Sequence, residues 1–419
     1  MQKIYFIISV LSIIAFGSAC GFINYSVNGS TPYFLAVSDI GTHRVLIWLT
    51  PPTRNQQAAD VVLGQPSMST GVVNNTPGAA GTRSAQSFFG PRSIFSNENY
   101  FFVSDQDNHR ILAWNGLPTN TQQAAVSVLG QSTMATGTSD AGGTTGSQGL
   151  NTPNNIWVVN GKTFVSDLTN HRVLIWNNIP TSFSQSASLI LGQPDFTSAV
   201  ANNTPSTPGT ASNQSLFRPS FVSSDGTKLF VADRDNHRVL IWNSIPTSTQ
   251  QAAHRVIGQT TMAGVAQGTG PGMSFPLGVT SCANMLMVVD FGNNRVLIWN
   301  THPTNDGQAP DIVLGQPSLT TNTANNTPGA AGTVSASSLS SPTQVFCDGQ
   351  KVYVADNSNR RILIWNKIPT TNQQAADIVL GQPDMATGTA GTTNSQTFVS
   401  PIGLFTNSNQ AGVYKPGGY

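Results

Sequence analysis

Charge is what this sequence has least of. Only 9% of its 419 residues are charged, 19 of them Lys or Arg and 18 Asp or Glu, and the net charge is +1. About a quarter is usual in globular domains. Such a neutral chain excludes a nucleic-acid binder that works by neutralising phosphates, because that mechanism needs clustered Lys and Arg. It also argues against disorder caused by charge repulsion. With 38% apolar residues and seven Trp, the chain can build a sizeable core.

The first 32 residues predict the cellular location of the protein. Lys3 precedes an apolar run over 4–16, too short to span a bilayer, and small residues then lead to Cys20. This order resembles a bacterial lipoprotein signal, in which the cysteine receives the lipid. We expect a signal peptide over 1–19 and a lipid-anchored tether over 20–32. The expected location is the cell envelope, with the outer membrane favoured, or secretion by an ordinary signal peptide if Cys20 carries no lipid.

Cysteine is as scarce as charge beyond that point. Cys282 and Cys347 are the two that remain after residue 20. Two cysteines so far apart are no disulfide framework. A single bridge is one reading, and two buried free thiols are the reading that we favour.

One block of sequence recurs six times along the chain. The third copy reads Phe-Val-Ser-Asp at 164–167, Asn-His-Arg-Val-Leu-Ile-Trp at 170–176 and Leu-Gly-Gln-Pro at 191–194. A fixed period predicts a repeat fold. Every copy carries an Asp and, five residues later, an Arg. These pairs are Asp39 and Arg44, Asp105 and Arg110, Asp167 and Arg172, Asp233 and Arg238, Asp290 and Arg295, and Asp356 and Arg361.

Each copy contains strand signals and no convincing helix. The Val-Leu-Ile-Trp run is β-branched, aromatic and apolar at consecutive positions, which indicates a strand covered on both faces. Four strands in each of six copies predict an all-β fold, a six-bladed β-propeller of antiparallel sheets over 33–419. The first copy lacks its first strand, and 401–405 supplies one at the other end of the chain. We therefore expect both termini to build one blade, with 412–415 as an unexplained extra strand signal.

The best-formed copy identifies a resemblance. Val231-Ala232-Asp233 followed by Asn-His-Arg at 236–238 is similar to the NHL repeat, and such repeats cover nearly the whole chain after the leader. The longer form, with Gln-Gln-Ala-Ala-Asp at 56–60 and 373–377, resembles bacterial NHL-repeat proteins of unassigned role. The resemblance implies the propeller fold. It implies no function, because one fold supports many.

The repeated side chains are expected to be structural. A residue needed in all six blades serves something that all six share, so we expect each Asp to accept backbone N–H groups of the following turn. Each Arg is expected to be partly buried and to need a carboxylate partner, for which the repeated Asp is the candidate. The turn histidines, such as His171, are expected to be solvated. The Trp residues are expected to fill space between blades.

An enzyme with its active site in the central channel is the alternative hypothesis, and the innermost strands give it little support. Six-bladed propellers similar to this one include metal-dependent lactonases and lyases, whose His, Asp and Glu lie on the innermost strands. Here those strands, which begin at prolines, carry no His, Asp or Glu. No metal site or acid–base pair is visible, so we expect no cofactor. Ca²⁺ or Zn²⁺ belongs only to the alternative, a lyase or lactonase-like hydrolase. Arg92 is the one charged group expected to face the channel.

Long connections between copies, such as 67–88, 195–217 and 318–339, remain as candidates for binding. Their Thr, Ser, Asn and Gly residues suit either adaptable contacts or a packed loop, and the sequence does not choose between them. We expect a non-enzymatic binding or scaffold module with a protein or glycan partner at the cell envelope. We expect no nucleic-acid partner, and membrane contact through the lipid at Cys20 alone.

Overall fold

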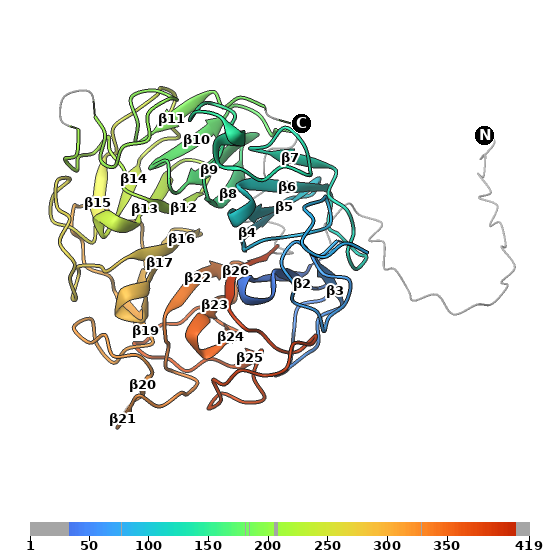
Figure 1. The fold of residues 1–419 in the computed structure, drawn as a ribbon. Coiled ribbons are helices and arrows are strands. Elements are labelled where there is room, and N and C mark those ends of the chain that lie inside the picture. Colours follow the sequence, from blue (N-terminus) through green and yellow to red (C-terminus); the bar gives the residue numbers. More distant parts are fainter. Residues whose placement is uncertain are drawn as a thin grey trace, which may run out of the picture. The chain divides into compact units, whose positions relative to one another are not determined.

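The computed structural model describes residues 33–407, except 77, 181, 184, 205–207 and 328. The predicted lipid site Cys20, the signal peptide, the tether and the strand signal at 412–415 lie outside the described residues. Six four-stranded antiparallel sheets surround a central channel as the blades of a β-propeller, which confirms the predicted fold class (Figure 1).

In each blade the strands run in order from the channel to the rim. The first blade contains β26 (Pro401–Thr406), β1 (Leu35–Asp39), β2 (Arg44–Trp48) and β3 (Val61–Leu63), and the second contains β4 (Pro91–Ser96), β5 (Tyr100–Asp105), β6 (Arg110–Asn115) and β7 (Ser127–Leu129). The third blade contains β8 (Pro153–Val159), β9 (Lys162–Asp167), β10 (Arg172–Trp176) and β11 (Leu189–Leu191), and the fourth contains β12 (Pro219–Ser224), β13 (Leu229–Asp233), β14 (Arg238–Trp242) and β15 (Arg255–Ile257). The fifth blade contains β16 (Pro276–Cys282), β17 (Met285–Asp290), β18 (Arg295–Trp299) and β19 (Ile312–Leu314), and the sixth contains β22 (Pro342–Cys347), β23 (Val352–Asp356), β24 (Arg361–Trp365) and β25 (Ile378–Leu380).

The third strand of each blade is buried along its whole apolar run. In β14, for example, all five residues are buried, because one face packs on each neighbouring blade. This explains the consecutive Val-Leu-Ile-Trp pattern. Each innermost strand starts at a proline, where the missing N–H costs no ladder bond. A register shift follows within three residues of the proline in all six of these strands, as between Pro219 and Phe221. Such bulges redirect side chains.

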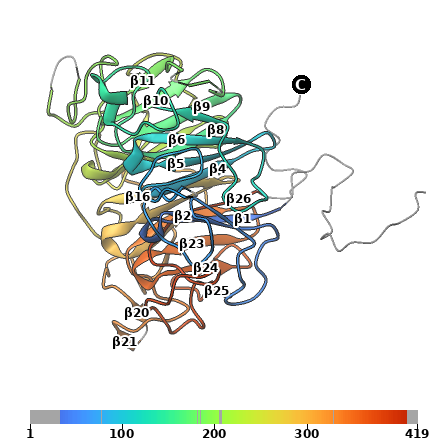
Figure 2. The same cartoon turned by 45° about the vertical axis from the view of Figure 1, so that its right-hand side comes forward.

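The ring closes with strands from opposite ends of the described chain. β26 pairs antiparallel with β1, from Leu35 opposite Thr406 to Ser38 opposite Gly403, and the two lie side by side in Figure 2. The expected closure is therefore confirmed. The joint covers the edge of β1, which would otherwise be unpaired, and gives the first blade the same four strands as the others. Gly403 is needed there, because a Cβ on it would lie 1.8 Å from the carbonyl oxygen of Arg92 in the next blade.

Helix is limited to short 3₁₀ turns in the described residues. Five of them follow the second strand of a blade: η1 (Ile40–Thr42), η2 (Gln106–Asn108), η4 (Arg234–Asn236), η5 (Phe291–Asn293) and η6 (Asn357–Asn359). One more, η3 (Ser139–Gly142), lies in a loop, where a two-stranded ribbon, β20 (Asn326–Thr327) with β21 (Ala330–Ala331), also occurs. None of the described helices is long or apolar enough to cross a membrane.

The two late cysteines correct one expectation. Cys282 and Cys347 form a disulfide, with Cα atoms 5.8 Å apart, and not two free thiols. They end β16 and β22, the innermost strands of neighbouring blades. Their separation of 65 residues hid the pairing, because it is the period of the repeat that places them side by side. The bridge joins the fifth blade to the sixth.

Candidate functional site

The repeated Asp and Arg form buried ion pairs within each blade. Asp233 lies opposite Arg238 in the β13–β14 ladder, and Arg238 Nε lies 2.7 Å from Asp233 Oδ2. The other five pairs span 2.7–3.2 Å, and all twelve side chains are fully buried. Burial raises the pKa of Asp233, and the charge of Arg238 with hydrogen-bond donors such as Asn236 opposes that rise.

The backbone donor to the Asp differs from the one expected. Asp233 Oδ1 accepts the N–H of Phe217, two residues before β12, at 2.7 Å, and not an N–H of the following turn. That turn contributes a side chain instead, since Asn236 Nδ2 donates to Oδ2 at 2.7 Å. Each Asp therefore joins the entry of its blade to the turn between its second and third strands. Local sequence could not predict this bond, because the N–H of Phe217 and the carboxylate of Asp233 are sixteen residues apart and meet only in the folded blade.

The Arg side chains fasten the long loops. We define the crown loops as the connections from the rim strand of one blade to the innermost strand of the next, over 64–90, 130–152, 192–218, 258–275, 315–341 and 381–400. Arg238 donates to the carbonyls of Ser212 and Ser215 in the loop entering its blade, and to that of Met262 in the loop leaving it. The crown loops are therefore packed at their bases. Their exposed tips, such as Gly78 to Gly81, remain available for contact.

The turn histidines are not merely solvated, which corrects another expectation. His171 has a left-handed backbone, φ 54°, and its Nδ1 accepts the N–H of Arg218 in the next blade at 3.1 Å. His43, His109 and His237 accept equivalent N–H groups at 3.0–3.3 Å. An acceptor Nδ1 requires the neutral ring. In keeping with this, burial lowers the pKa of His171 to about 4.

In the fifth blade Asn294 takes the same role, because its Oδ1 accepts the N–H of Ser341 at 2.8 Å. Asn and His are the residues that tolerate the left-handed region best after glycine and that also carry an acceptor at this reach. Five of the six blades therefore carry a short acceptor at this position, while the sixth carries Arg360, which keeps the left-handed backbone (φ 53°) but can only donate.

Two further repeated residues have roles that sequence reasoning missed. Each blade Trp donates its indole N–H to the carbonyl of a Gln nine residues later, as Trp242 does to Gln251 at 2.9 Å. The Gln of each Gly-Gln pair reaches back across the turn, so that Gln193 Nε2 donates to the carbonyls of His171 and Val200. The sixfold recurrence of these Gln residues was the available signal.

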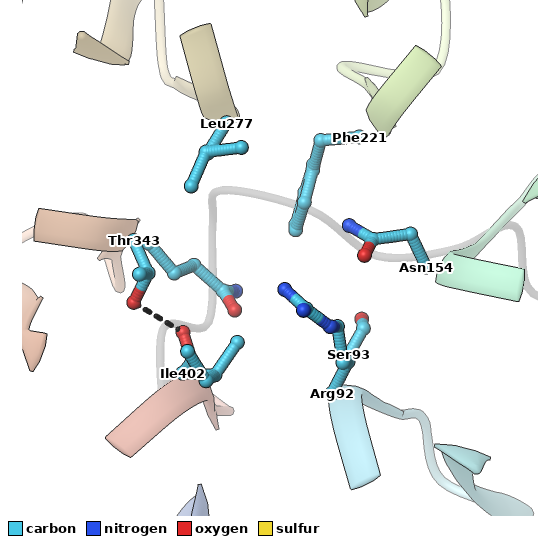
Figure 3. A pocket seen from close by; sticks show the side chains of 8 residues that line it. Arg92, Ser93, Asn154, Phe221, Leu277, Thr343 and Ile402 are labelled. Carbon is cyan, nitrogen blue, oxygen red and sulfur yellow. Dashed lines mark hydrogen bonds between the residues drawn. The ribbon is translucent and has the colours of Figure 1, made fainter. Parts of the chain in front are cut away.

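The channel opens on the crown-loop side as a small pocket (Figure 3). Its empty volume is about 290 Å³, including the opening to solvent. The lining comes from the first residues of the innermost strands: Arg92, Ser93, Asn154, Phe221, Leu277, Thr343, Gln344 and Ile402. Arg92, the residue predicted to face the channel, points its guanidinium toward the centre in Figure 3. It is the one titratable side chain among these eight.

Most polar groups around the pocket are occupied by hydrogen bonds within the second blade or between blades. Arg92 Nε donates to Gln106, Gln106 donates to Asn154 at 2.9 Å, and Asn154 donates to the carbonyl of Ser220 at 2.6 Å. On the other side, Thr343 donates to the carbonyl of Ile402 at 2.8 Å. Such bonds hold the blades together and leave few groups for a ligand.

The electrostatics of Arg92 follow from its surroundings. Burial lowers the pKa of Arg92, the carboxylate of Asp107 opposes this, and the guanidinium of Arg234 adds to it. An arginine starts high enough to stay charged in proteins. The mouth of the channel therefore holds a fixed positive charge, partly balanced by one nearby carboxylate.

Beyond the pocket, aromatic rings occupy the channel side of four blades. Trp157 packs on Phe95, Phe95 on Phe405, and Phe405 on Phe346, with ring centroids 5.0–5.3 Å apart. Within the described residues, no group of three or more His, Cys, Asp or Glu is placed to hold a metal ion. The pocket thus offers one cation, neutral hydrogen-bonding groups and apolar walls.

Comparisons with known proteins add little. No protein-family model and no curated protein matches the sequence. Three solved structures align at a TM-score of 0.44: a functionally unknown protein from Desulfotomaculum acetoxidans (9% identity, 91% of this chain and 100% of that one), a candidate 6-phosphogluconolactonase from Bacteroides fragilis (11%, 91% and 99%) and another from Bacteroides uniformis (10%, 89% and 99%). Similarity at this level carries no argument about function, and the fold rests on the strand pairing described above.

Proposed function

We propose that this chain is an exported, lipid-anchored propeller of the NHL type that acts as a binding module. The partner is a protein or a glycan. It contacts the face made by the crown loops, and an anionic group of the partner enters the mouth of the channel and binds Arg92. Lipid on Cys20 anchors the module to the cell envelope. The enzyme alternative has less support, since Arg92 has no acid or base beside it in the pocket lining.

The position of Arg92 carries this proposal. Its Nε is held by Gln106, which orients the guanidinium, and the guanidinium with its two terminal nitrogens is directed toward the centre of the pocket (Figure 3). Among the described residues, the hydrogen bond of Arg92 is made through Nε and not through these terminal nitrogens. With Nε engaged, the edge formed by the two terminal nitrogens is the one suited to a carboxylate or another planar oxyanion. The neutral surface around it supplies hydrogen bonds and little long-range attraction.

The export hypothesis has support of its own. A disulfide such as Cys282–Cys347 persists in oxidising compartments and is rare in the cytosol of mesophiles. The low charge of the chain and the lipoprotein-like leader point the same way. Fatty-acid labelling tests the anchor: label must appear in the protein and disappear in Cys20→Ala.

Binding is tested with acidic and neutral glycans and with envelope proteins, using the purified propeller. Arg92→Gln removes the charge and keeps a hydrogen-bonding side chain. We expect it to weaken the interaction about 10-fold or more, the loss of one charge-assisted bond. Arg54→Gln, an exposed arginine on the loop between β2 and β3, is the matched control and should change nothing. Equal binding by wild type and Arg92→Gln would refute the site. A Ca²⁺ or Zn²⁺ ion tightly held in the channel would favour the enzyme alternative.

A further inference from the structure

The fifth blade departs from the repeat at one buried position. Three residues after the blade Trp, the second, third, fourth and sixth copies carry Leu117, Ile179, Ile245 and Ile368. The fifth copy carries His302, whose side chain is 7% exposed. The repeat acts here as an internal control, since four blades are built with an apolar side chain at this place. A buried imidazole must find polar partners.

The first partner of His302 is Ser281, near the end of β16. At the same register of other innermost strands, Ser96, Ser224 and Thr406 donate their hydroxyls to backbone carbonyls. Ser281 differs, because its Oγ lies 2.8 Å from His302 Nε2. Ser281 is also partly exposed, whereas Ser96, Ser224 and Thr406 are buried. A serine hydroxyl on an imidazole nitrogen is the pairing that activates a nucleophile.

The second partner is Asp225, from the β12–β13 hairpin of the neighbouring fourth blade. Its Oδ1 accepts the N–H groups of Thr227 and Lys228 at 2.7 and 2.6 Å, which fixes the carboxylate. Its Oδ2 faces His302 Nδ1 at 3.6 Å. This is an ion-pair distance, longer than a hydrogen bond, and such contacts tighten when substrate binds. The order of groups is serine, imidazole, carboxylate, as in the hydrolytic triads that recur on unrelated folds.

We propose that Ser281 is a nucleophile that accepts acyl groups from small carboxylic esters, with His302 as its general base and Asp225 as the residue that positions His302. Ser281 Oγ attacks the ester carbonyl, and its proton passes to His302 Nε2. The C–O bond to the alcohol breaks, and the alcohol leaves with that proton. Water then attacks the acyl-serine in the same way, which releases the acid and restores Ser281.

The charge state of His302 suits this role. Burial lowers the pKa of His302, the carboxylate of Asp225 opposes that shift, the ammonium of Lys228 adds to it, and a hydrogen bond with the backbone of Met285 opposes it. The ring is therefore neutral at pH 7. With its proton on Nδ1, beside Asp225, Nε2 is free to accept the proton of Ser281.

This site is separate from the proposed binding face. β16 begins at Pro276 opposite Asp290 on the crown-loop side and ends at Cys282 opposite Met285, so Ser281 lies at the far end of the strand. Failure of either proposal therefore leaves the other intact. The sequence held a signal for His302, namely a histidine at a position that four of the other five copies fill with Ile or Leu.

The test uses the whole propeller, a fluorophosphonate probe and p-nitrophenyl acetate. We expect the probe to label Ser281 in peptide mapping and Ser281→Ala to abolish that label. His302→Ile restores the residue of the other blades, so it should fold, and it should slow labelling and esterolysis about 100-fold. The rate should rise with pH through a midpoint below 6.5. Asp225→Asn keeps the hairpin, as Asn97 does in the second blade, and should lower this midpoint further.

Ser96 and Ser224 are internal controls, since they share the register of Ser281 but have no imidazole. Labelling of Ser281 no faster than that of Ser96 and Ser224 overturns the proposal. So does labelling that His302→Ile leaves unchanged, provided that circular dichroism shows the variant folded. A pH midpoint that Asp225→Asn does not move would remove Asp225 from the mechanism.

Discussion

Arg238 gives the sharpest test of how the blades are held together. The guanidinium is fully buried, and it joins three parts of the chain: the turn at Asp233, the entering loop at Ser212 and Ser215, and the leaving loop at Met262. Arg238→Ala removes the donor and leaves every acceptor in place. The stability of the fourth blade should fall sharply.

The magnitude follows from these contacts. An isolated buried carboxylate at Asp233 costs about 3–5 kcal/mol once its partner is removed. Each buried carbonyl left without a donor adds about 1–3 kcal/mol, although the terms overlap and water recovers part of the loss. We therefore expect Arg238→Ala to lower the free energy of unfolding by about 4 kcal/mol or more. Arg238→Lys keeps the charge without the fork of five donors, so it should lie between alanine and wild type.

Urea titration followed by tryptophan fluorescence measures this loss, because Trp242 is buried in the same blade. The control is Arg54→Ala, an exposed arginine, which should change stability by less than about 0.5 kcal/mol. If Arg238→Ala falls within that same range, the pair does not support the fold, and our account of all six repeated pairs is wrong.

Three further predictions concern the joints between blades. The folded-state pKa of His171, about 4, lies below its ordinary value, so its contribution to folding stability is complete above pH 6.5 and is lost as the pH falls toward 4. His171→Asn should therefore reduce the loss of thermal stability in acid. A pH dependence of the melting temperature that this variant leaves unchanged would contradict the prediction. Gly403→Ala forces a Cβ onto the Arg92 carbonyl and should destabilise by about 2 kcal/mol or more. Gly146→Ala, whose Cβ would meet only the carbonyl oxygen of Thr144 at an ordinary contact distance of 3.8 Å, should be nearly neutral, and equal melting temperatures for the two variants would count against the tight closure. Replacing Cys282 and Cys347 by serine opens a 65-residue loop and should cost about 2–4 kcal/mol in urea, with dithiothreitol giving the same loss in the wild type and no effect on the variant.

Much of the architecture was predictable because the same strand and turn pattern occurs six times in the sequence. The Val-Leu-Ile-Trp runs, the leading prolines and the missing first strand of the first copy led to the blade number, the strand order and the closure by β26 and β1. The repeats reveal less about side-chain partners. Asp233 was expected to bond to its own turn, yet it reaches Phe217, because the start of the innermost strand folds back beside that turn.

The candidate sites were less predictable. Arg92 was found from its register on an inner strand, but the bond that orients it comes from Gln106 on another segment of the blade. The sequence left open whether the crown loops are contact surfaces or packed connections. The buried arginines bond to the bases of these loops, so the bases are packed and the tips are exposed. Ser281, His302 and Asp225 were not found together, since they belong to two blades and nothing in their spacing predicts a contact.

The sequence by itself therefore determined the period, the strands and the channel-facing register, because each depends on local patterns of apolar residues, prolines and turns. The tertiary structure alone decided which groups meet across blades: the histidine acceptors on the next blade, the disulfide between the fifth and sixth, and the contact of His302 with Asp225 of the fourth blade. The physical reason is that a propeller packs neighbouring blades together, so that residues far apart in the chain meet between them. Local sequence fixes the blade, and the packing of blades fixes the chemistry between them.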